Sequence, residues 1–303
     1  MGLSLGVVLP MSEFSPDGLA PRWPEMLATT RLAEELGADT IWLGDEILWR
    51  DPEWSQPNMG WWDMLAVAGA LAASTSSIRI GSWVMSAVQH QPGMIVRAAE
   101  ALDEISGGRF VLGLGAGHGG GATDFGFATD KTVSRLLEAL EIIVPLLRGQ
   151  ESVTFDGQFH HANDAQVRPR GPRPGRIPLM MGAMGEKTMT AAARHADIWS
   201  AYARTSSLPD AFADMTSRLD RICEEVGREP ASIGRSVGVF VELGDGHTAE
   251  ATGFGTPISG SIEQITETIA AFADVGVTRV EIVAWPPKID VLTQLAPVFS
   301  ALA

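Results

Sequence analysis

The 303-residue sequence is poor in several residue types that particular functions require. It has a single cysteine, Cys223, which excludes an internal disulfide and a cysteine-based zinc cluster. Its six histidines show no H-x-x-x-H or similar ligand spacing, so we expect no metal site. Basic residues are also few, because 22 Lys and Arg stand against 37 Asp and Glu for a formal charge of −15 at pH 7. Such a surface repels nucleic acid and anionic membranes, so neither is an expected partner.

Long apolar runs are missing as well. No stretch reaches the roughly 18 apolar residues that a membrane span requires. Residues 1–10 have neither a basic region nor a long apolar segment, which argues against a signal peptide. The single cysteine fits a reducing compartment, and we expect a cytoplasmic protein.

The residues that are present alternate between two patterns. Apolar residues make up 45% of the chain, enough for a large core. Apolar strand-like runs are each followed by a segment with helical spacing, which implies parallel strands. Eight such units without a second composition regime predict a closed (β/α)8 barrel, or TIM barrel, in one domain of residues 1–303. The expected strands are 3–9, 40–43, 78–84, 110–114, 177–181, 198–202, 236–243 and 277–284. The expected helices are 23–36, 62–73, 95–105, 132–147, 187–195, 209–226, 262–275 and 291–302.

Two long segments interrupt this rhythm. Residues 46–61 follow the second strand and carry Trp49 and Trp54, which we predict to contact an apolar or aromatic substrate. Residues 149–176 form an insertion before the fifth strand, and an Asp-Gly pair predicts a hairpin over 153–159. Long loops in compact domains are functional or disordered, and the loops that follow strands form the active face of a barrel.

Four strand ends carry residues suited to binding or catalysis, and all four belong to one face of a barrel. A carboxylate pair binds ligands or transfers protons, glycines let a flat ligand approach the backbone, and free N–H groups at a helix start bind phosphate. Each segment also has an ordinary explanation as a loop acid, core packing, a flexible loop or a simple turn. The residues are Asp45, Glu46, Ser82, Trp83, Val84, Gly115, Ala116, Gly117, His118, Gly182, Ala183, Met184, Gly185, Glu186 and Lys187.

Two other enzyme classes fit these strand ends less well. Residues 115–120 match G-x-G-x-x-G, but a dinucleotide fingerprint opens a helix, whereas residues 122–130 are loop-like. A hydrolase or aldolase needs a nucleophile, and Lys187 beside the 182–187 turn is better explained by phosphate binding.

Five segments in a fixed order resemble a known family. They are Ile41-Trp42-Leu43-Gly44-Asp45, Ile80-Gly81-Ser82-Trp83-Val84, residues 102–109 (LDEISGGR), residues 112–117 (LGLGAG) and residues 191–199 (AAARHADIW). Together they resemble the bacterial luciferase-like superfamily of flavin- and deazaflavin-dependent oxidoreductases. Residues 223–236 resemble the branch assigned to coenzyme F-420, an 8-hydroxy-5-deazaflavin.

The resemblance implies a ring-shaped cofactor at the C-terminal mouth of the barrel. Asp45 would contact the cofactor, and the peptide bond between Trp83 and Val84 would be a non-prolyl cis bond whose bulge supports the ring. Residues 115–118 would line the other edge of the ring, and residues 182–187 would hold the cofactor phosphate. Arg109 is expected to be structural. Arg168, Arg170, Arg173 and Arg176 of the insertion are candidates for binding the acidic cofactor tail, with a solvated loop as the alternative.

One position departs from the family. Many members have Asp-His after the second strand, where this chain has Asp45-Glu46. We therefore predict His118 as the main acid–base group and Glu46 as its partner. The leading hypothesis is hydride transfer between reduced coenzyme F-420 and an organic substrate. The alternatives are an FMN-dependent monooxygenase that uses reduced flavin and oxygen, and a non-catalytic cofactor-binding protein. A separate reductase and a homodimer are the expected partners.

Overall fold

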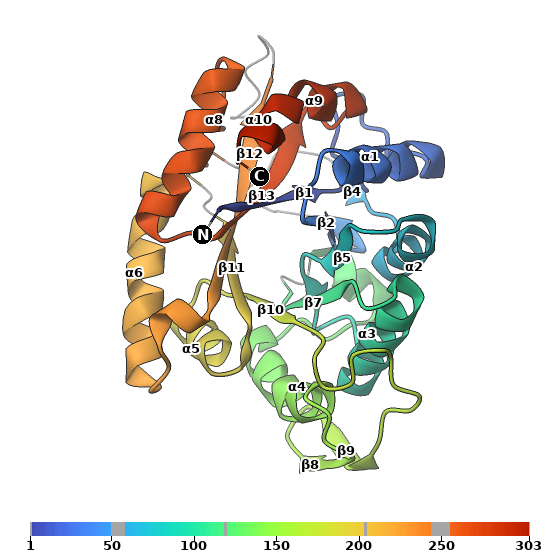
Figure 1. The fold of residues 1–303 in the computed structure, drawn as a ribbon. Helices are drawn as coiled ribbons and strands as arrows, with labels where there is room; N and C mark the ends of the chain where they lie inside the picture. Colours follow the sequence, from blue (N-terminus) through green and yellow to red (C-terminus); the bar gives the residue numbers. More distant parts are fainter. Residues whose placement is uncertain (1, 50–57, 118–119, 203–204, 244–254, 303) are drawn as a thin grey trace.

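A computed structural model of the chain describes residues 2–49, 58–117, 120–202, 205–243 and 255–302. Its centre is a closed ring of parallel strands, in which each strand pairs with the next and the last pairs with the first (Figure 1). The strands are β1 (Ser4–Val8), β2 (Thr40–Leu43), β5 (Arg79–Ser82), β7 (Phe110–Gly115), β10 (Leu179–Gly182), β11 (Ile198–Tyr202), β12 (Gly234–Glu242) and β13 (Arg279–Trp285). The predicted (β/α)8 barrel is confirmed.

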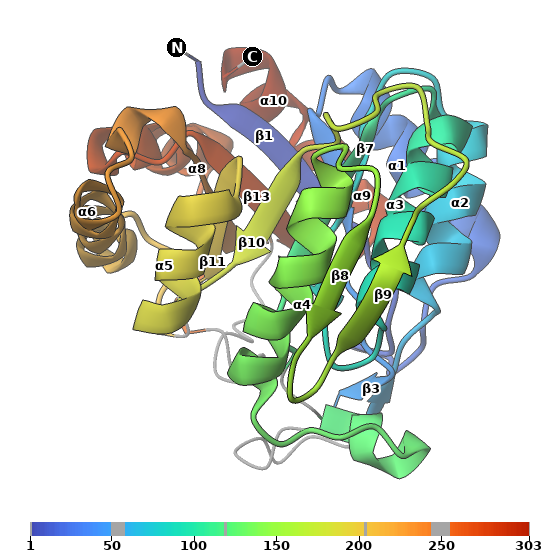
Figure 2. The same cartoon turned by 90° about the horizontal axis from the view of Figure 1, so that it is seen from below.

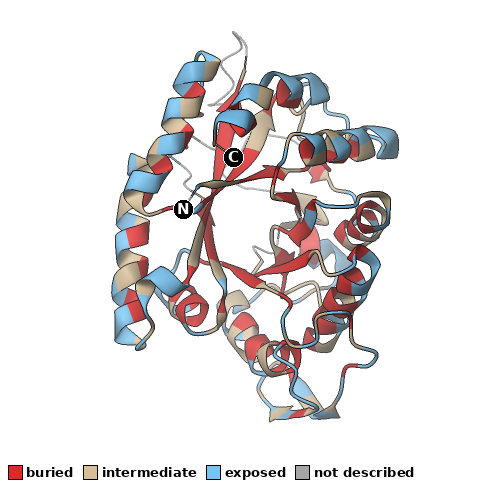
Figure 3. Cartoon of the chain, in the orientation of Figure 1, coloured by how far each residue is buried: buried red, intermediate tan, exposed pale blue. Residues whose placement is uncertain are grey.

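Helices surround this ring and turn their buried sides toward it (Figure 3). In α3, for example, Ile95, Val96, Ala99 and Leu102 are buried, which is the spacing of one helical face. The helices are α1 (Trp23–Glu35), α2 (Met64–Ser74), α3 (Pro92–Ser106), α4 (Thr132–Leu147), α5 (Glu186–His195), α6 (Asp210–Glu225), α8 (Ile262–Ala270), α9 (Ile289–Gln294) and α10 (Ala296–Leu302). Short 3-10 segments are η1 (Gly120–Phe125), η2 (Pro230–Ser232) and η3 (Ala271–Val275).

Two of the predicted helices differ from the observed ones. The predicted helix 262–275 is α-helical only to Ala270 and continues as η3, which ends before Gly276 in the left-handed region. The predicted helix 291–302 is divided into α9 and α10. Pro297 lies in the first turn of α10, and its missing N–H explains why one continuous helix does not form.

The interior of the ring is filled by Trp42, which is fully buried. The two strands beside β2 leave room for it with glycines. A Cβ atom on Gly6 would lie 2.6 Å from the Trp42 Nε1 atom, and one on Gly81 would lie 2.2 Å from the ring. Val111 and Met180 complete this buried cluster. The core of the barrel is therefore a packed layer and not a channel.

A charged network closes the amino-terminal end of the ring. The Glu281 carboxylate accepts hydrogen bonds from Trp42 Nε1, from Ser236 Oγ at 2.9 Å and from Arg279 Nε at 3.3 Å. Arg279 also donates to Asp39. Burial raises the pKa of the Glu281 carboxyl, although the Arg279 charge and the hydrogen bonds act in the opposite direction.

The insertion forms the predicted hairpin, with its second strand further along the chain than predicted. Strand β8 (Val153–Asp156) pairs in antiparallel fashion with β9 (His161–Ala165), and the hairpin lies along the outside of α4 (Figure 2). Glu138 on α4 accepts the backbone N–H groups of residues 158–160 in the turn. These three bonds fasten the hairpin to the barrel.

Candidate functional site

Most of the predicted site residues lie at the carboxyl ends of the strands. The first of these ends is a break in the strand after β5. Strand β5 ends at Ser82, and β6 (Met85–Ser86) resumes pairing beside β7. The bond between Trp83 and Val84 is cis, as the resemblance implied. The Ser82 hydroxyl donates to the Gly113 carbonyl and accepts the Gly113 N–H, both at 2.8 Å. Ser82 is fully buried, so its hydroxyl holds β5 to β7 at this break.

The Trp83 side chain crosses the barrel above the Trp42 cluster. Its Nε1 atom donates to Ser200 Oγ on β11 at 3.3 Å. A Cβ atom on Gly238 of β12 would lie 2.3 Å from the Trp83 ring. The indole therefore spans the interior from β5 to the opposite wall, and it separates the packed core from the mouth of the barrel.

Val84 lies across the ends of two neighbouring strands. A Cβ atom on Gly115 would lie 2.5 Å from Val84 Cγ2, and one on Gly182 would lie 3.2 Å from the same atom. A larger residue at Gly115 would displace the valine, and one at Gly182 would press against it. Because Val84 is only half-buried, part of its apolar surface faces the mouth.

Asp45 follows β2 and pairs with a residue that the sequence analysis did not select. Its Oδ2 atom accepts the Ser86 N–H at 2.8 Å and a hydrogen bond from His90 Nε2 at 3.0 Å. Burial lowers the pKa of His90, but the hydrogen bond and charge of Asp45 and the charge of Asp63 outweigh it, so the pKa is raised above 6.5. The only sequence signal for His90 was its place after the third strand, just before α3.

The loops after β2 and β7 meet at the mouth. Strand β3 (Leu48–Trp49) pairs with β4 (Met59–Gly60), and a Cβ atom on Gly121 of η1 would lie 2.5 Å from Leu48 Cβ. Glu46 and Trp49 are half-buried in the first of these loops. His118 and Trp54 lie outside the described residues, so their roles stay predictions, as does that of Glu46.

Two buried polar atoms flank Asp45 without a hydrogen-bond partner among the described residues. Trp61 Nε1 lies beside Gly44, whose Cβ atom would be 3.1 Å away. Ser86 Oγ lies beside Gly117, whose Cβ atom would be 2.2 Å away. Gly117 has a φ of +73°, and Ala116 beside it is half-buried. Unpaired buried polar groups are costly and gather at functional sites, so this part of the mouth suits a polar ligand.

The turn from β10 to α5 is fixed at its inner end and exposed at its outer end. The Ala183 N–H donates to the Ser200 carbonyl at 3.0 Å, and the Ala183 carbonyl accepts Trp199 Nε1 at 2.7 Å. Met184, Gly185, Glu186 and Lys187 are exposed. Gly185 is the N-cap residue and has no side chain to occupy the first N–H groups of α5.

Arg218 reaches this turn from α6 and was missed by the sequence analysis. Its Nε and Nη2 atoms donate to Glu186 Oε2 at 3.1 and 2.8 Å, and its Nη1 atom donates to the Met184 carbonyl at 3.3 Å. Nothing local marks an arginine in the middle of an amphipathic helix as a site residue. Its place beside α5 adds a positive charge to the helix start.

The expected role of the insertion arginines in binding the cofactor tail is wrong for Arg170 and Arg173. Arg170 donates to Glu100 and to the Leu146 carbonyl at the end of α4. Arg173 donates to Asp103 and to the carbonyl of Phe110, the first residue of β7. Both therefore lie at the amino-terminal end of the barrel. The reason is topological, because the insertion follows a helix and not a strand.

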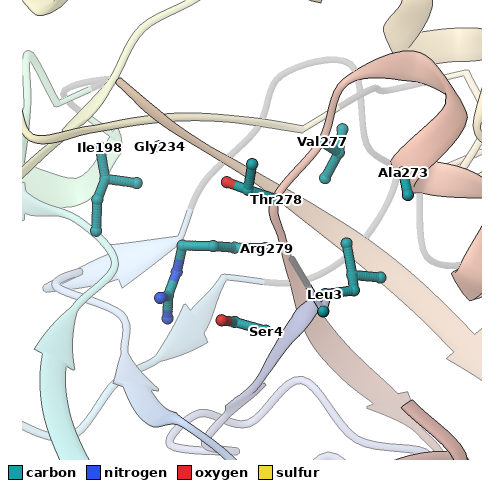
Figure 4. A pocket seen from close by; sticks show the side chains of 9 residues that line it. Leu3, Ser4, Ile198, Gly234, Ala273, Val277, Thr278 and Arg279 are labelled. Carbon is teal, nitrogen blue, oxygen red and sulfur yellow. The ribbon is translucent and has the colours of Figure 1, made fainter. Parts of the chain in front are cut away.

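A pocket of about 280 Å³ also lies at that amino-terminal end (Figure 4). It is lined by Ser4, Ile198, Gly234 and Arg279, each at or near the first residue of its strand. Arg279 is bound there by Asp39 and Glu281. This pocket is separated from Asp45 and Val84 by the whole packed interior.

The described part of the chain has neither a metal-binding cluster nor a membrane-spanning helix. No group of three or more His, Cys, Asp and Glu residues in it is placed to hold a metal ion. None of its helices is long and apolar enough to cross a membrane.

Comparisons with known proteins agree with the fold. A 5,10-methylenetetrahydromethanopterin reductase of Archaeoglobus fulgidus is 34% identical over 185 residues, which are 61% of this chain and 50% of that protein. The chain therefore spans about half the length of that relative. An F-420-dependent glucose-6-phosphate dehydrogenase of Kineococcus radiotolerans is 28% identical over 271 residues, 86% of this chain and 75% of that protein.

Solved structures share the barrel across its full length. One is an F-420-dependent secondary alcohol dehydrogenase in complex with an F-420–acetone adduct, with a TM-score of 0.82 at 15% identity and coverage of 100% of both chains. That similarity shows a common fold. Residues 3–253 match the family described as luciferase-like monooxygenase, which confirms the resemblance found in the sequence. The chain belongs to the luciferase-like monooxygenase family.

Proposed function

We propose that this protein is an oxidoreductase that transfers a hydride between coenzyme F-420 and a small organic substrate at the C-terminal mouth of its barrel. The proposal rests on the close packing of Val84 against Gly115 and Gly182. This packing gives the mouth an apolar floor, bordered by backbone that carries no side chain. Such a floor suits one face of a flat tricyclic ring.

The residues around this floor fit the other parts of a deazaflavin. Asp45 and the unpaired Trp61 Nε1 and Ser86 Oγ atoms suit the polar edge of a ring. The uncapped first turn of α5, with Lys187 and Arg218 beside it, suits a phosphate group. When bound, the deazaflavin supplies or accepts the hydride.

The side chains of the chain then have three tasks. Trp83 and Val84 exclude water from one face of the ring, which strengthens every electrostatic interaction in the site. His118 and Glu46 donate or accept the proton that accompanies hydride transfer at the substrate. Trp49 and Trp54 offer apolar surface to the substrate, which we propose to be apolar or aromatic.

The choice of coenzyme F-420 over FMN is supported by residues 223–236 and by the similarity to an F-420-dependent glucose-6-phosphate dehydrogenase. The FMN-dependent monooxygenase is the second candidate, and the description of the family as a monooxygenase favours it. The two differ chemically, because a reduced flavin reacts with oxygen and a deazaflavin does not react in the same way. Cofactor identity therefore also decides the reaction class.

Titration of the purified protein with each cofactor tests the proposal. We expect fluorescence quenching to show tighter binding of coenzyme F-420 than of FMN, with affinity reduced by added salt. Preferred binding of FMN would instead support the monooxygenase. Binding of neither cofactor would refute both. Tight binding of coenzyme F-420 without turnover of any apolar or aromatic alcohol, ketone or alkene would favour a cofactor-binding protein without catalysis.

The proposal extends to the oligomeric state and the cellular compartment of the protein. We propose a homodimer in the cytoplasm, with a separate reductase that regenerates the reduced cofactor. The exposed apolar side chains of Leu19, Trp23 and Trp62 support a dimer, because Trp62 Nε1 donates to the Pro21 carbonyl and so holds the three near one another. Light scattering of the protein in solution tests the dimer directly.

A further inference from the structure

The pair formed by Asp45 and His90 lies at the mouth, and the function proposed above gives a role to Asp45 but none to His90. His90 precedes α3, and Asp45 follows β2, so the pair joins two separate loops. Asp45 has 9% of its side chain exposed and His90 has 22%. A carboxylate this deeply buried needs partners, because its desolvation is costly.

Both donors to Asp45 bind the same oxygen. Ser86 N–H is fixed in place, because β6 pairs with β7 and Ser86 lies opposite Gly115. His90 Nε2 binds Oδ2 from the other loop. Two donors from independent elements on one oxygen set the direction of the carboxylate plane.

Charge gives the pair a second consequence. The chain carries −15 overall, and Asp45, Glu46 and Asp63 all lie near the mouth. Addition of a hydride to a flavin or deazaflavin ring leaves one negative charge on the ring unless a proton is also taken up, so an unbalanced carboxylate beside it would repel the reduced anion. A protonated His90 makes the pair with Asp45 neutral.

We propose that His90 is a positioning residue, which holds the Asp45 carboxylate in one orientation and balances its charge so that the site accepts the reduced cofactor. The orientation and charge of Asp45 are properties of the protein alone. The effect on the cofactor rests on the proposed function.

The pH dependence follows from the groups that face His90. Among the described residues these are Asp45 and Asp63, both negative, with Glu46 next along the loop from Asp45. The first titratable side chain of α3 is Arg97, which is exposed and donates to Met94 Sδ. Because the pKa of His90 is raised, its protonated form is present below pH 6.5 and is lost as the pH rises through the higher folded value.

The first experiment uses the protein without cofactor. A histidine NMR titration should show His90 with a pKa above 6.5, and Asp45→Asn should bring that value below 6.5, because burial then acts without the carboxylate. His161 forms a similar pair with Asp156, at 2.8 Å, on the exposed hairpin and serves as the reference. A His90 pKa at or below 6.5 in the parent protein would overturn the proposal.

The second experiment measures the affinity for reduced coenzyme F-420 between pH 6 and 9. In the parent protein we expect affinity to fall about tenfold as His90 loses its proton, the size of one hydrogen bond to a charged group. His90→Gln keeps an N–H donor without the charge, so its affinity should be uniformly weaker and lose this pH step. His161→Gln should behave as the parent.

Three results separate the possible outcomes. A pH step that persists in His90→Gln contradicts the proposal. If His90→Gln lowers only the urea midpoint and leaves cofactor affinity and its pH profile unchanged, His90 is merely structural and the proposal fails. If coenzyme F-420 does not bind the parent protein, the proposed function fails, and the NMR titration still decides whether His90 balances Asp45.

Discussion

Replacement of Gly115 by alanine tests the floor of the mouth most directly. A Cβ atom there would lie 2.5 Å from Val84 Cγ2, whereas carbon atoms in contact lie about 3.5–4.0 Å apart. Neither partner can move easily, because Gly115 belongs to β7 and Val84 lies between β5 and β6. The methyl group must therefore push the Val84 side chain out of its seat.

The size of the effect follows from two opposing contributions. Overpacking of this kind costs about 1–3 kcal/mol of stability. Exchange of glycine for alanine within a strand recovers about 0.5–1 kcal/mol. We expect the free energy of unfolding to fall by about 1–2 kcal/mol. If the displaced valine weakens cofactor binding by a similar free energy, the affinity for cofactor falls about tenfold.

Two glycines elsewhere supply graded controls. At Gly182 the Cβ atom would lie 3.2 Å from Val84, so a shift of a few tenths of an ångström relieves the contact and the loss should be small. At Gly93, in the first turn of α3, nothing lies within 4 Å of the added atom, so alanine should be neutral or stabilising. Urea unfolding and cofactor titration of the three variants measure both quantities.

The same series can refute the reasoning. If Gly115→Ala is as stable and binds cofactor as tightly as Gly182→Ala, Val84 is not held as the distances indicate. A double variant with Val84→Ala adds an independent check. It should recover the stability lost in Gly115→Ala, because the clash is removed, but not the cofactor affinity, because the apolar floor is also removed.

Three further variants test other contacts. Glu34→Gln should lower the free energy of unfolding by about 1–2 kcal/mol at pH 7 in urea titrations, because Glu34 accepts the N–H groups of residues 76–78. Glu35→Gln, on the exposed side of α1, should leave the free energy of unfolding unchanged. Burial raises the pKa of Glu34, but these bonds lower it to about 2, so its stabilisation is complete above pH 4.5 and should disappear toward pH 2. Arg218→Gln should weaken cofactor binding two- to fivefold in equilibrium dialysis, roughly the value of a charge at a helix end, and Glu186→Gln should not weaken it. His118→Ala should reduce turnover by about 10²–10⁴ with cofactor affinity retained, and unchanged turnover in both this variant and Glu46→Gln would contradict the acid–base assignment.

The sequence predicted the barrel well because its signals are local. The spacing of apolar residues that indicates a strand or a helix can be read within each segment. The bounds of β2, α4 and β11 match the prediction residue for residue. The errors occur where a helix changes type or is interrupted, as at η3 and at the boundary of α9 and α10. There the period of the apolar residues continues although the backbone hydrogen bonds do not.

Among the site residues, the sequence could predict only those whose own position follows the end of a strand. Asp45, Val84 and Gly115 follow from that rule together with the family resemblance. The contact of His90 with Asp45 depends on where two loops pass each other, and the contact of Arg218 with Glu186 depends on the packing of α6 beside α5. No period or spacing within one segment encodes such a contact.

The insertion arginines show that the strand-end rule also predicts which residues do not belong to the mouth. Loops after strands form the mouth, whereas residues 149–176 follow α4, and Arg170 and Arg173 lie at the other end of the barrel. Arg170 and Arg173 accordingly bind Glu100 and Asp103. Positive charge for an acidic cofactor tail must then come from elements that reach the carboxyl ends of the strands. Arg218 does so, through its hydrogen bond to the Met184 carbonyl in the turn that opens α5.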